Sequence, residues 1–306
     1  MTHWKKALLA VLLAILLGAG YWYYLVASYD SGLGTENSFV AHDSNPNLSN
    51  STNDSLLSMS FDFGEDELEW AFTTVTLSDG EQNFDCTVSG LSSIPQENEK
   101  IKTKLNADGK TFTISIDSTS ETSYTKMSLY SMNELDSSNH SIRFSKTDIF
   151  LGANISWMSI DGISFADLHE IPNENFSNDT SSQLDWYDYD LSTHRIEPKD
   201  RIFVINDIET TYKIQFLSYY NEQDESRYIT MVASWLDGAP IPAINDSELV
   251  KSSPCIIIDE NHVWESDETI FIQENNFDIC HSSCALTIIV TFEDINVEGT
   301  SRVDLD

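Results

Sequence analysis

Basic residues are scarce in this chain. Only 16 of its 306 residues are Lys or Arg, against 50 Asp or Glu, and the formal net charge is −34. A polyanion of this size repels nucleic acids and anionic lipids, and both are therefore excluded as partners. The charge fits a surface bathed in salty water, where screening weakens self-repulsion and hydrated carboxylates keep the protein soluble. Specific calcium sites are the alternative, but the sequence has no Asp-x-Asp-x-Asp-Gly loop.

The motifs of common enzymes are also missing. The sequence has no Gly-x-Ser-x-Gly elbow, no His-Glu-x-x-His, no phosphate loop and no dinucleotide fingerprint. Its carboxylates are so numerous that no acid–base pair can be singled out. A glycosidase on a β scaffold would need two of them about 5–10 Å apart, which the sequence alone does not show. We therefore predict that the protein is not an enzyme.

Cysteine is limited to four residues, an even number that suits two disulfides in an oxidising compartment. Of the three possible pairings we favour Cys255–Cys280, which closes a local unit, together with Cys86–Cys284. Because three of the four cysteines follow residue 254, at least one bridge is expected to tie Cys86 to the C-terminal region. A metal or redox site at Cys280 and Cys284 is the alternative, although a distant fourth ligand gives a poor zinc spacing.

Eight Asn-x-Ser/Thr sequons agree with an extracytoplasmic location, although an Asn- and Ser-rich chain produces some of them by chance. The predicted glycosylation sites are Asn47, Asn50, Asn53, Asn139, Asn154, Asn175, Asn178 and Asn245.

Residues 7–27 form one long apolar run that is long enough to cross a bilayer as a helix. Two lysines precede it and acidic residues follow, so residues 1–6 are expected in the cytoplasm and the bulk of the chain outside the cell. We favour an uncleaved signal anchor in the cell membrane, and the alternative is a signal peptide cleaved near Gly18-Ala19-Gly20. Residues 28–58, rich in Ser, Asn and Gly, are expected to form a flexible stalk.

Amphipathic helices are missing from the rest of the chain, whereas period-two alternation is frequent. Residues 212–220 and 228–236 alternate around a polar turn and predict a hairpin. Residues 101–105 and 111–116 predict a second hairpin around an Asn-Ala-Asp-Gly turn. Short strands recur at intervals of roughly 8–12 residues, so we predict a mainly β protein. Its ectodomain is expected to be an antiparallel β-sandwich or barrel-like domain behind one N-terminal transmembrane helix.

The ectodomain divides into three parts after the stalk. Residues 59–238 are expected to form the main β domain. Three prolines between residues 240 and 254 make 239–254 the expected linker. Residues 255–306 contain short strand patterns and three cysteines, and they are expected to form a small disulfide-tied β unit.

Five short blocks follow one another between residues 186 and 236. They are Trp186-Tyr187-Asp188-Tyr189, Pro198-Lys199-Asp200-Arg201, Ile202-Phe203-Val204-Ile205, Lys213 to Tyr220, and Tyr228-Ile229-Thr230. Their order resembles the C-terminal half of the HmuY family, which are extracytoplasmic haem-binding proteins. The resemblance is specific over residues 186–236 and weak before them, and it does not extend to residues 245–306. It implies a cell-surface binding protein with haem as its cofactor.

Haem chemistry would require axial ligands that face each other across an aromatic cleft. The aromatic cleft that the resemblance implies consists of Trp186, Tyr187 and Tyr189. The same resemblance places one iron ligand in the loop that contains His194, and His140 is the best partner for it by position. Methionine substitutes for these ligands are Met127, Met132 and Met158. The alternative function is a structural or adhesive surface protein that keeps the fold, contacts a surface protein and holds no haem.

Overall fold

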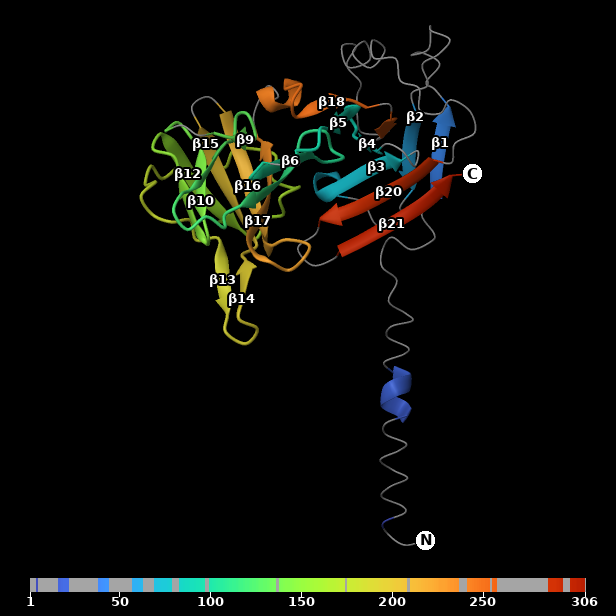
Figure 1. Ribbon diagram of the computed structural model, residues 1–306, viewed down its shortest axis with the longest axis horizontal. Helices are drawn as coiled ribbons and strands as arrows, with labels where there is room; N and C mark the ends of the chain where they lie inside the picture. Colours follow the sequence, from blue (N-terminus) through green and yellow to red (C-terminus); the bar gives the residue numbers. More distant parts are fainter. Residues whose placement is uncertain are drawn as a thin grey trace.

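The computed structural model confirms a mainly β protein built from antiparallel sheets. It describes residues 4, 16–21, 38–43, 57–62, 69–78, 83–96, 99–135, 138–173, 175–207, 210–236, 241–253, 255–257, 286–293 and 298–305. Two groups of strands are visible in Figure 1, one around β12 and β15–β17 and the other around β3, β20 and β21. The first group contains the element of functional interest.

A six-stranded sheet forms the centre of the first group. Its strands follow the order β12 (Ile155–Asp161), β15 (Arg201–Asp207), β16 (Thr210–Tyr220), β17 (Ser226–Trp235), β7 (Phe112–Asp117) and β6 (Ile101–Leu105). Both predicted hairpins are confirmed, because β16 pairs with β17 and β6 pairs with β7 in antiparallel register. In β16, Tyr212 and Ile214 point to one face of the sheet and Lys213 to the other, and all three are buried.

A four-stranded sheet packs against one face of the six-stranded sheet. Its strands follow the order β11 (Asp148–Leu151), β10 (Ile142–Ser145), β8 (Thr125–Ser128) and β9 (Asn133–Glu134). Buried Met127 and Phe144 from this sheet share one hydrophobic core with Ile114, Tyr212 and Phe216 from the other. Each fully buried side chain of this kind stabilises the fold by roughly 1.5–3 kcal/mol, so this interface holds the two sheets together as a sandwich.

The opposite face of the six-stranded sheet carries a smaller core. Ile202, Val204 and Val232 point to this side and pack with Phe72 and Phe165. Phe72 belongs to the 3-10 helix η1 (Trp70–Phe72), and its ring meets that of Phe165 edge-on at 5.7 Å between centroids. The loop that contains Phe165 is thereby fixed on the sheet.

The second group combines strands from both ends of the chain. Strand β20 (Leu286–Glu293) lies between β21 (Glu298–Leu305) and β3 (Thr73–Ser78), and β3 also pairs with β4 (Asn83–Cys86). Strand β2 (Leu57–Asp62) lies between β1 (Ser38–Asp43) and β19 (Cys255–Ile257). The short strand β5 (Leu91–Ser93) pairs with β18 (Val250–Ser252). The C-terminal strands therefore pair with strands from the first third of the chain.

This pairing differs from the expected division of the ectodomain. Residues 255–306 were expected to be a unit of their own, yet β19 and β20 pair with β2 and β3. The expected linker, residues 239–254, contains η2 (Pro242–Asn245) and β18, and its Ile241 and Leu249 are buried in the sandwich core. Strand β1 falls inside the expected stalk. Sequence patterns are local, whereas these contacts join residues far apart in the chain.

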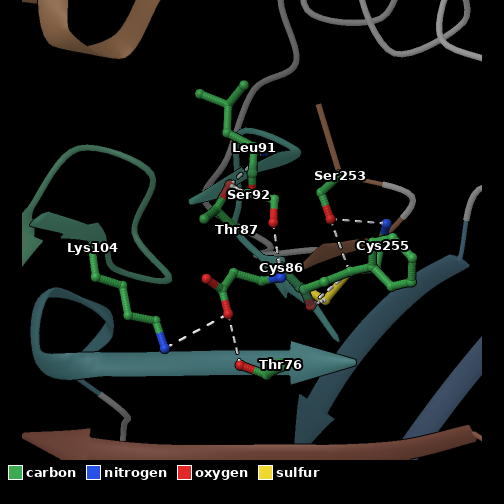
Figure 2. Close-up of a disulfide and its surroundings, with 10 residues drawn as sticks. Thr76, Cys86, Thr87, Leu91, Ser92, Lys104, Ser253 and Cys255 are labelled. Atoms are coloured by element: carbon green, nitrogen blue, oxygen red, sulfur yellow. Dashed lines mark hydrogen bonds and ion pairs between the residues drawn. A yellow bond between two sulfur atoms is a disulfide. The ribbon is translucent and has the colours of Figure 1, made fainter. Parts of the chain in front are cut away.

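One disulfide joins Cys86, at the end of β4, to Cys255, at the start of β19, with the Cα atoms 5.3 Å apart (Figure 2). The favoured pairing of Cys255 with Cys280 and of Cys86 with Cys284 is therefore wrong, although Cys86 is tied to the C-terminal region as expected. A parallel bridge between Thr87 and Ile256 brings the two half-cystines together across 169 residues of chain. Cys280 and Cys284 lie outside the described residues.

Hydrogen bonds hold the segments on both sides of the disulfide. The Ser253 hydroxyl lies 3.0 Å from the Cys255 Sγ atom and accepts a bond from the Cys255 amide. On the other side, the Asp85 carboxylate accepts a bond from the Thr76 hydroxyl, and the Asp85 amide donates to Ser92 (Figure 2).

Within the part of the chain that the structure describes, no helix has both the length and the apolar character needed to cross a membrane. Residues 16–21 are helical, and their Leu16, Leu17 and Tyr21 side chains are exposed. The remainder of the predicted span, residues 7–15 and 22–27, lies outside the described residues.

Candidate functional site

The candidate site is the hairpin formed by β13 (Tyr187–Asp190) and β14 (Arg195–Pro198). These two strands form a sheet of their own and extend away from the strands of the sandwich (Figure 1). The hairpin carries two of the three predicted cleft aromatics and one of the predicted iron ligands. Its tip exposes Tyr189 (49 %) and Leu191 (78 %), which are unusually open for large apolar side chains.

Trp186 does not line a cleft. It is fully buried in the sandwich core, where its ring lies 5.1 Å from that of Phe216 and 6.1 Å from that of Tyr219. Its indole Nε1 donates a 2.9 Å hydrogen bond to the Thr147 carbonyl oxygen, which satisfies its one polar atom. The prediction that Trp186 contacts a ligand is therefore corrected, because this side chain anchors the start of the hairpin. Tyr187 is half-buried against the same core.

His194 lies in the turn of the hairpin, with a left-handed φ of 57°. Its Nδ1 atom is 3.1 Å from the Tyr189 hydroxyl, so the strand and the turn bring these two predicted site residues together. The bond fixes the orientation of the imidazole and leaves its Nε2 atom without a role in the turn. In the tautomer whose Nδ1–H donates to the Tyr189 hydroxyl, Nε2 keeps its lone pair, and this is the arrangement that metal-binding histidines commonly show.

His140 does not lie near His194. The neighbouring Ser141 hydroxyl is bonded to the carboxylate of Asp207, at the last residue of β15. The hairpin instead joins β15 at its first residue, Arg201. Seven extended residues span roughly 20 Å, so the two histidines sit beyond opposite ends of one strand. Both ligands of one iron must lie within bonding distance of it. His140 and His194 are too far apart for this, so they do not form the predicted pair of iron ligands.

The methionine substitutes are also placed away from the hairpin tip. Met127 and Met132 are fully buried in the sandwich core, and Met158 is buried in the smaller core on the opposite face. Among the residues that the structure describes, no group of three or more His, Cys, Asp or Glu side chains converges on a common point.

The hairpin turn is held by one carboxylate. Asp190 accepts hydrogen bonds from the Thr193 hydroxyl at 2.6 Å and from the amide and hydroxyl of Ser192, both at 2.7 Å. These donors stabilise the ionised form and lower the pKa of Asp190 to about 2. The turn is therefore ordered by bonds within the tip itself, and the side chain of Leu191 remains exposed.

One side of the hairpin is attached to the loop between β16 and β17. The Arg195 guanidinium forms two bonds with the Asp224 carboxylate, at 2.6 and 3.0 Å, and lies 3.9 Å from the centre of the Tyr220 ring. The Tyr220 hydroxyl in turn accepts a 3.0 Å bond from the Ile196 amide. Bidentate pairing and ring stacking both need the planar guanidinium, so lysine would not replace Arg195 here.

The base of the hairpin is held by a network of ion pairs. Arg201 forms two bonds with Asp161 on β12, at 2.7 and 3.0 Å, and one with Asp185 at 2.8 Å. Lys199 contacts Asp185 at 2.6 Å and Asp188 at 3.5 Å. Bonds to Asp161 and Asp185 raise the pKa of Arg201, and the bond to Lys199 lowers the pKa of Asp185. A connected network of this kind fixes geometry better than an isolated surface pair does.

Sequence reasoning missed this network. Lys199 and Arg201 were noted only as part of a block of family resemblance, and their partners Asp161 and Asp185 are two of 50 acidic residues. The alternation of β12 and β15 would have placed residues 161 and 201 opposite each other once these strands were paired. Pairing of β12 with β15 was the missing information.

The predicted glycosylation sites that the structure describes are all on the surface. Asn139, Asn154, Asn175, Asn178 and Asn245 are exposed, so each is open to modification. Asn47, Asn50 and Asn53 lie outside the described residues. Glycosylation remains a prediction at all eight positions.

Comparison with models of known protein families gives no match, and comparison with curated proteins gives none either. Solved structures do match at low identity. A proposed lipoprotein from Bacteroides fragilis is 15 % identical, with 43 % of this chain and 92 % of that chain covered and a TM-score of 0.36. A proposed HmuY-like haem-binding protein from Bacteroides vulgatus is 13 % identical, with 43 % and 94 % covered and a TM-score of 0.36. The apo HmuY analogue of Tannerella forsythia is 11 % identical, with 48 % and 95 % covered and a TM-score of 0.29.

HmuY-like proteins are among the structural neighbours, as the sequence resemblance predicted. TM-scores below 0.5 are too low for these structures to support a conclusion about the fold or function of this chain.

Proposed function

We propose that this protein is a binding protein of the cell surface and that the β13–β14 hairpin is its contact element. A signal anchor at residues 7–27 would hold it in the membrane, with the sheets outside the cell. The Cys86–Cys255 disulfide supports this location, because such bonds persist in oxidising compartments. The exposed sequons support it as well.

The observation that carries the proposal is a hairpin that is rigidly held yet exposed at its tip. Arg195 and Arg201 attach it to two other parts of the protein, and Asp190 orders its turn. The apolar surfaces of Tyr189 and Leu191 remain open to solvent at the tip. Pre-ordered contact residues lose little conformational entropy on binding, which favours affinity.

Haem is the ligand that we propose, with His194 as its contact. The His194 imidazole would hold the haem iron, which binds a histidine nitrogen when haem is present. The residues fit one such contact: the Tyr189 hydroxyl holds His194 through Nδ1, Nε2 is free to bind, and Leu191 offers an apolar side chain next to it in the turn. They do not fit a clamp between His194 and His140. The adhesive or structural alternative keeps the same hairpin and requires no iron ligand.

Titration of the full-length protein with haemin, followed by Soret absorbance, tests the haem proposal. We expect a saturable Soret shift that is lost in His194→Ala and weakened in Tyr189→Phe, which removes the hydroxyl that orients the imidazole. His169→Ala changes an exposed histidine elsewhere, and His140→Ala changes the candidate ligand that lies away from the hairpin, so both should behave as the wild type. No Soret shift, or one that His194→Ala leaves unchanged, would reject haem and favour the adhesive alternative.

A further inference from the structure

Lys213 is a lysine buried in a place where an apolar residue would be expected. It lies on β16 and points to the face of the six-stranded sheet that carries the smaller core, with only 5 % of its surface exposed. Its Nζ atom donates hydrogen bonds to the carbonyl oxygens of Phe165, at 2.5 Å, and Leu168, at 2.9 Å. The same atom lies 4.3 Å from the centre of the Phe165 ring. Two of the three donors of the ammonium are therefore used by the backbone.

Within the described part of the chain, the charge of Lys213 has no close counter-ion. Among the ion pairs of the described residues, none joins a carboxylate oxygen to its Nζ within 4.0 Å. Burial, and to a smaller extent Lys110, lower the pKa of Lys213 to about 8, while Asp108 and Asp167 oppose this from a greater distance. In a chain with 50 acidic and 16 basic residues, a buried cation without a carboxylate next to it is unexpected.

A pocket of ≈ 140 Å³ lies next to Lys213. Lys110 and His169, both exposed, form its rim, and Trp235 and Leu236 form part of its wall. Its volume is close to the roughly 150 Å³ of a cavity that admits a benzene-sized molecule. The pocket therefore has room for a ligand of about six non-hydrogen atoms, and three of its lining side chains are basic.

We propose that this pocket binds a small oxyanion, of the size of phosphate or a short carboxylate, between the Lys213 ammonium and the rim groups Lys110 and His169. The anion would accept the third donor of Lys213 and supply the counter-charge that its burial requires. The volume of ≈ 140 Å³ limits the site to small anions, and Asp108 and Asp167 lower the positive potential around Lys213. This site is separate from the β13–β14 hairpin and does not rest on the proposed function.

Binding at this pocket should be linked to protonation of Lys213. An oxyanion binds the ammonium and not the neutral amine, so bound anion raises the pKa of Lys213. Above about pH 8 the free protein carries the neutral amine, and anion binding must then take up a proton. The affinity is therefore expected to fall about tenfold for each pH unit above 8, provided that the fold is unchanged.

Calorimetric titration of the full-length protein with inorganic phosphate and, separately, with acetate tests the proposal at pH 7 and pH 9. We expect saturable binding of at least one probe at pH 7 and about tenfold weaker binding at pH 9. The probe that binds identifies the class of anion, and either result supports the site. Absence of saturable binding by both probes would overturn it.

Three variants locate the binding. Lys213→Met should abolish it, and Lys110→Gln, which changes an exposed rim residue and is expected to leave the fold intact, should weaken it severalfold. Lys251→Gln removes an exposed lysine on β18 and should leave it unchanged. Equal weakening by Lys110→Gln and Lys251→Gln would mean that the anion only screens the surface charge, and the site would be rejected.

Discussion

Asp190 shows how one side chain orders the tip of the hairpin. Its carboxylate accepts bonds from Thr193 and Ser192, and these bonds need the ionised form. Because its pKa in the folded protein lies near 2, below the ordinary value of 3.8, its stabilising effect is complete above pH 3.8. The effect is lost as the pH falls through about 2. The tip is therefore expected to stay ordered in mildly acidic surroundings.

The Asp190 pKa depends on a bond that can be removed without touching the carboxylate. Thr193→Val replaces the hydroxyl that donates the 2.6 Å bond by a methyl group of similar size. We expect the pKa of Asp190 to rise from about 2 toward 3.8, as followed by carboxyl chemical shifts in a pH titration. Thr180→Val, in a loop away from the hairpin, is the control. An unchanged Asp190 pKa in Thr193→Val would contradict this account of the turn.

At this scale, part of the site was predictable from sequence. Tyr189 and His194 are five residues apart, and a tight hairpin brings such positions together, so the resemblance placed both near one point. Trp186 and His140 were misplaced for a different reason. The burial of Trp186 depends on Phe216 and Tyr219, and the position of His140 depends on the end of β15 that the neighbouring Ser141 contacts. Neither fact is present in the local sequence.

At the scale of elements, the β13–β14 hairpin depends on side chains outside it. Arg201 connects its base to β12, through two bonds with Asp161. The Asp161 carboxylate of this ion pair is exposed to solvent, so the contribution of the pair to global stability is expected to be small. The effect of the pair on the mobility of the hairpin should be larger, because β13 and β14 form a two-stranded sheet separate from the sandwich sheets.

Arg201→Gln tests this dependence. We expect faster amide hydrogen exchange across residues 187–198, together with an unchanged midpoint of thermal unfolding, because the global fold does not need the ion pair. Arg227→Gln removes an ion pair with Glu121 at another edge of the sandwich and serves as the matched control. Exchange in the hairpin that is equally slow in Arg201→Gln and in the wild type would show that the network does not hold it.

Elements differed in how well the sequence predicted them. The hairpins β16–β17 and β6–β7 were predicted because their alternation and turns are local and their partners are neighbours in the chain. The sheet formed by β3, β4, β20 and β21 was not, because β3 and β20 are more than 200 residues apart. The wrong disulfide pairing has the same origin, since proximity in sequence was used where proximity in the fold decides.

At the scale of the whole molecule, the Cys86–Cys255 disulfide closes a loop of 169 residues. Loop-closure entropy for this length predicts that the bond stabilises the folded state by about 5 kcal/mol at most. The double variant Cys86→Ser/Cys255→Ser should therefore lose about 2–5 kcal/mol of unfolding free energy, measured by denaturant titration. Ser115→Ala/Ser159→Ala, which changes two exposed serines and keeps the disulfide, is the control. A double cysteine variant as stable as the wild type would contradict a structural role for this bond.

Hydrogen exchange with and without haemin is the decisive test of whether the β13–β14 hairpin contacts the ligand. Amides are compared residue by residue along the full-length protein. We expect haemin to slow exchange in the hairpin turn, around Leu191 and His194, and to leave the six-stranded sheet unchanged. Protection confined to another part of the protein, with none in residues 187–198, would contradict it.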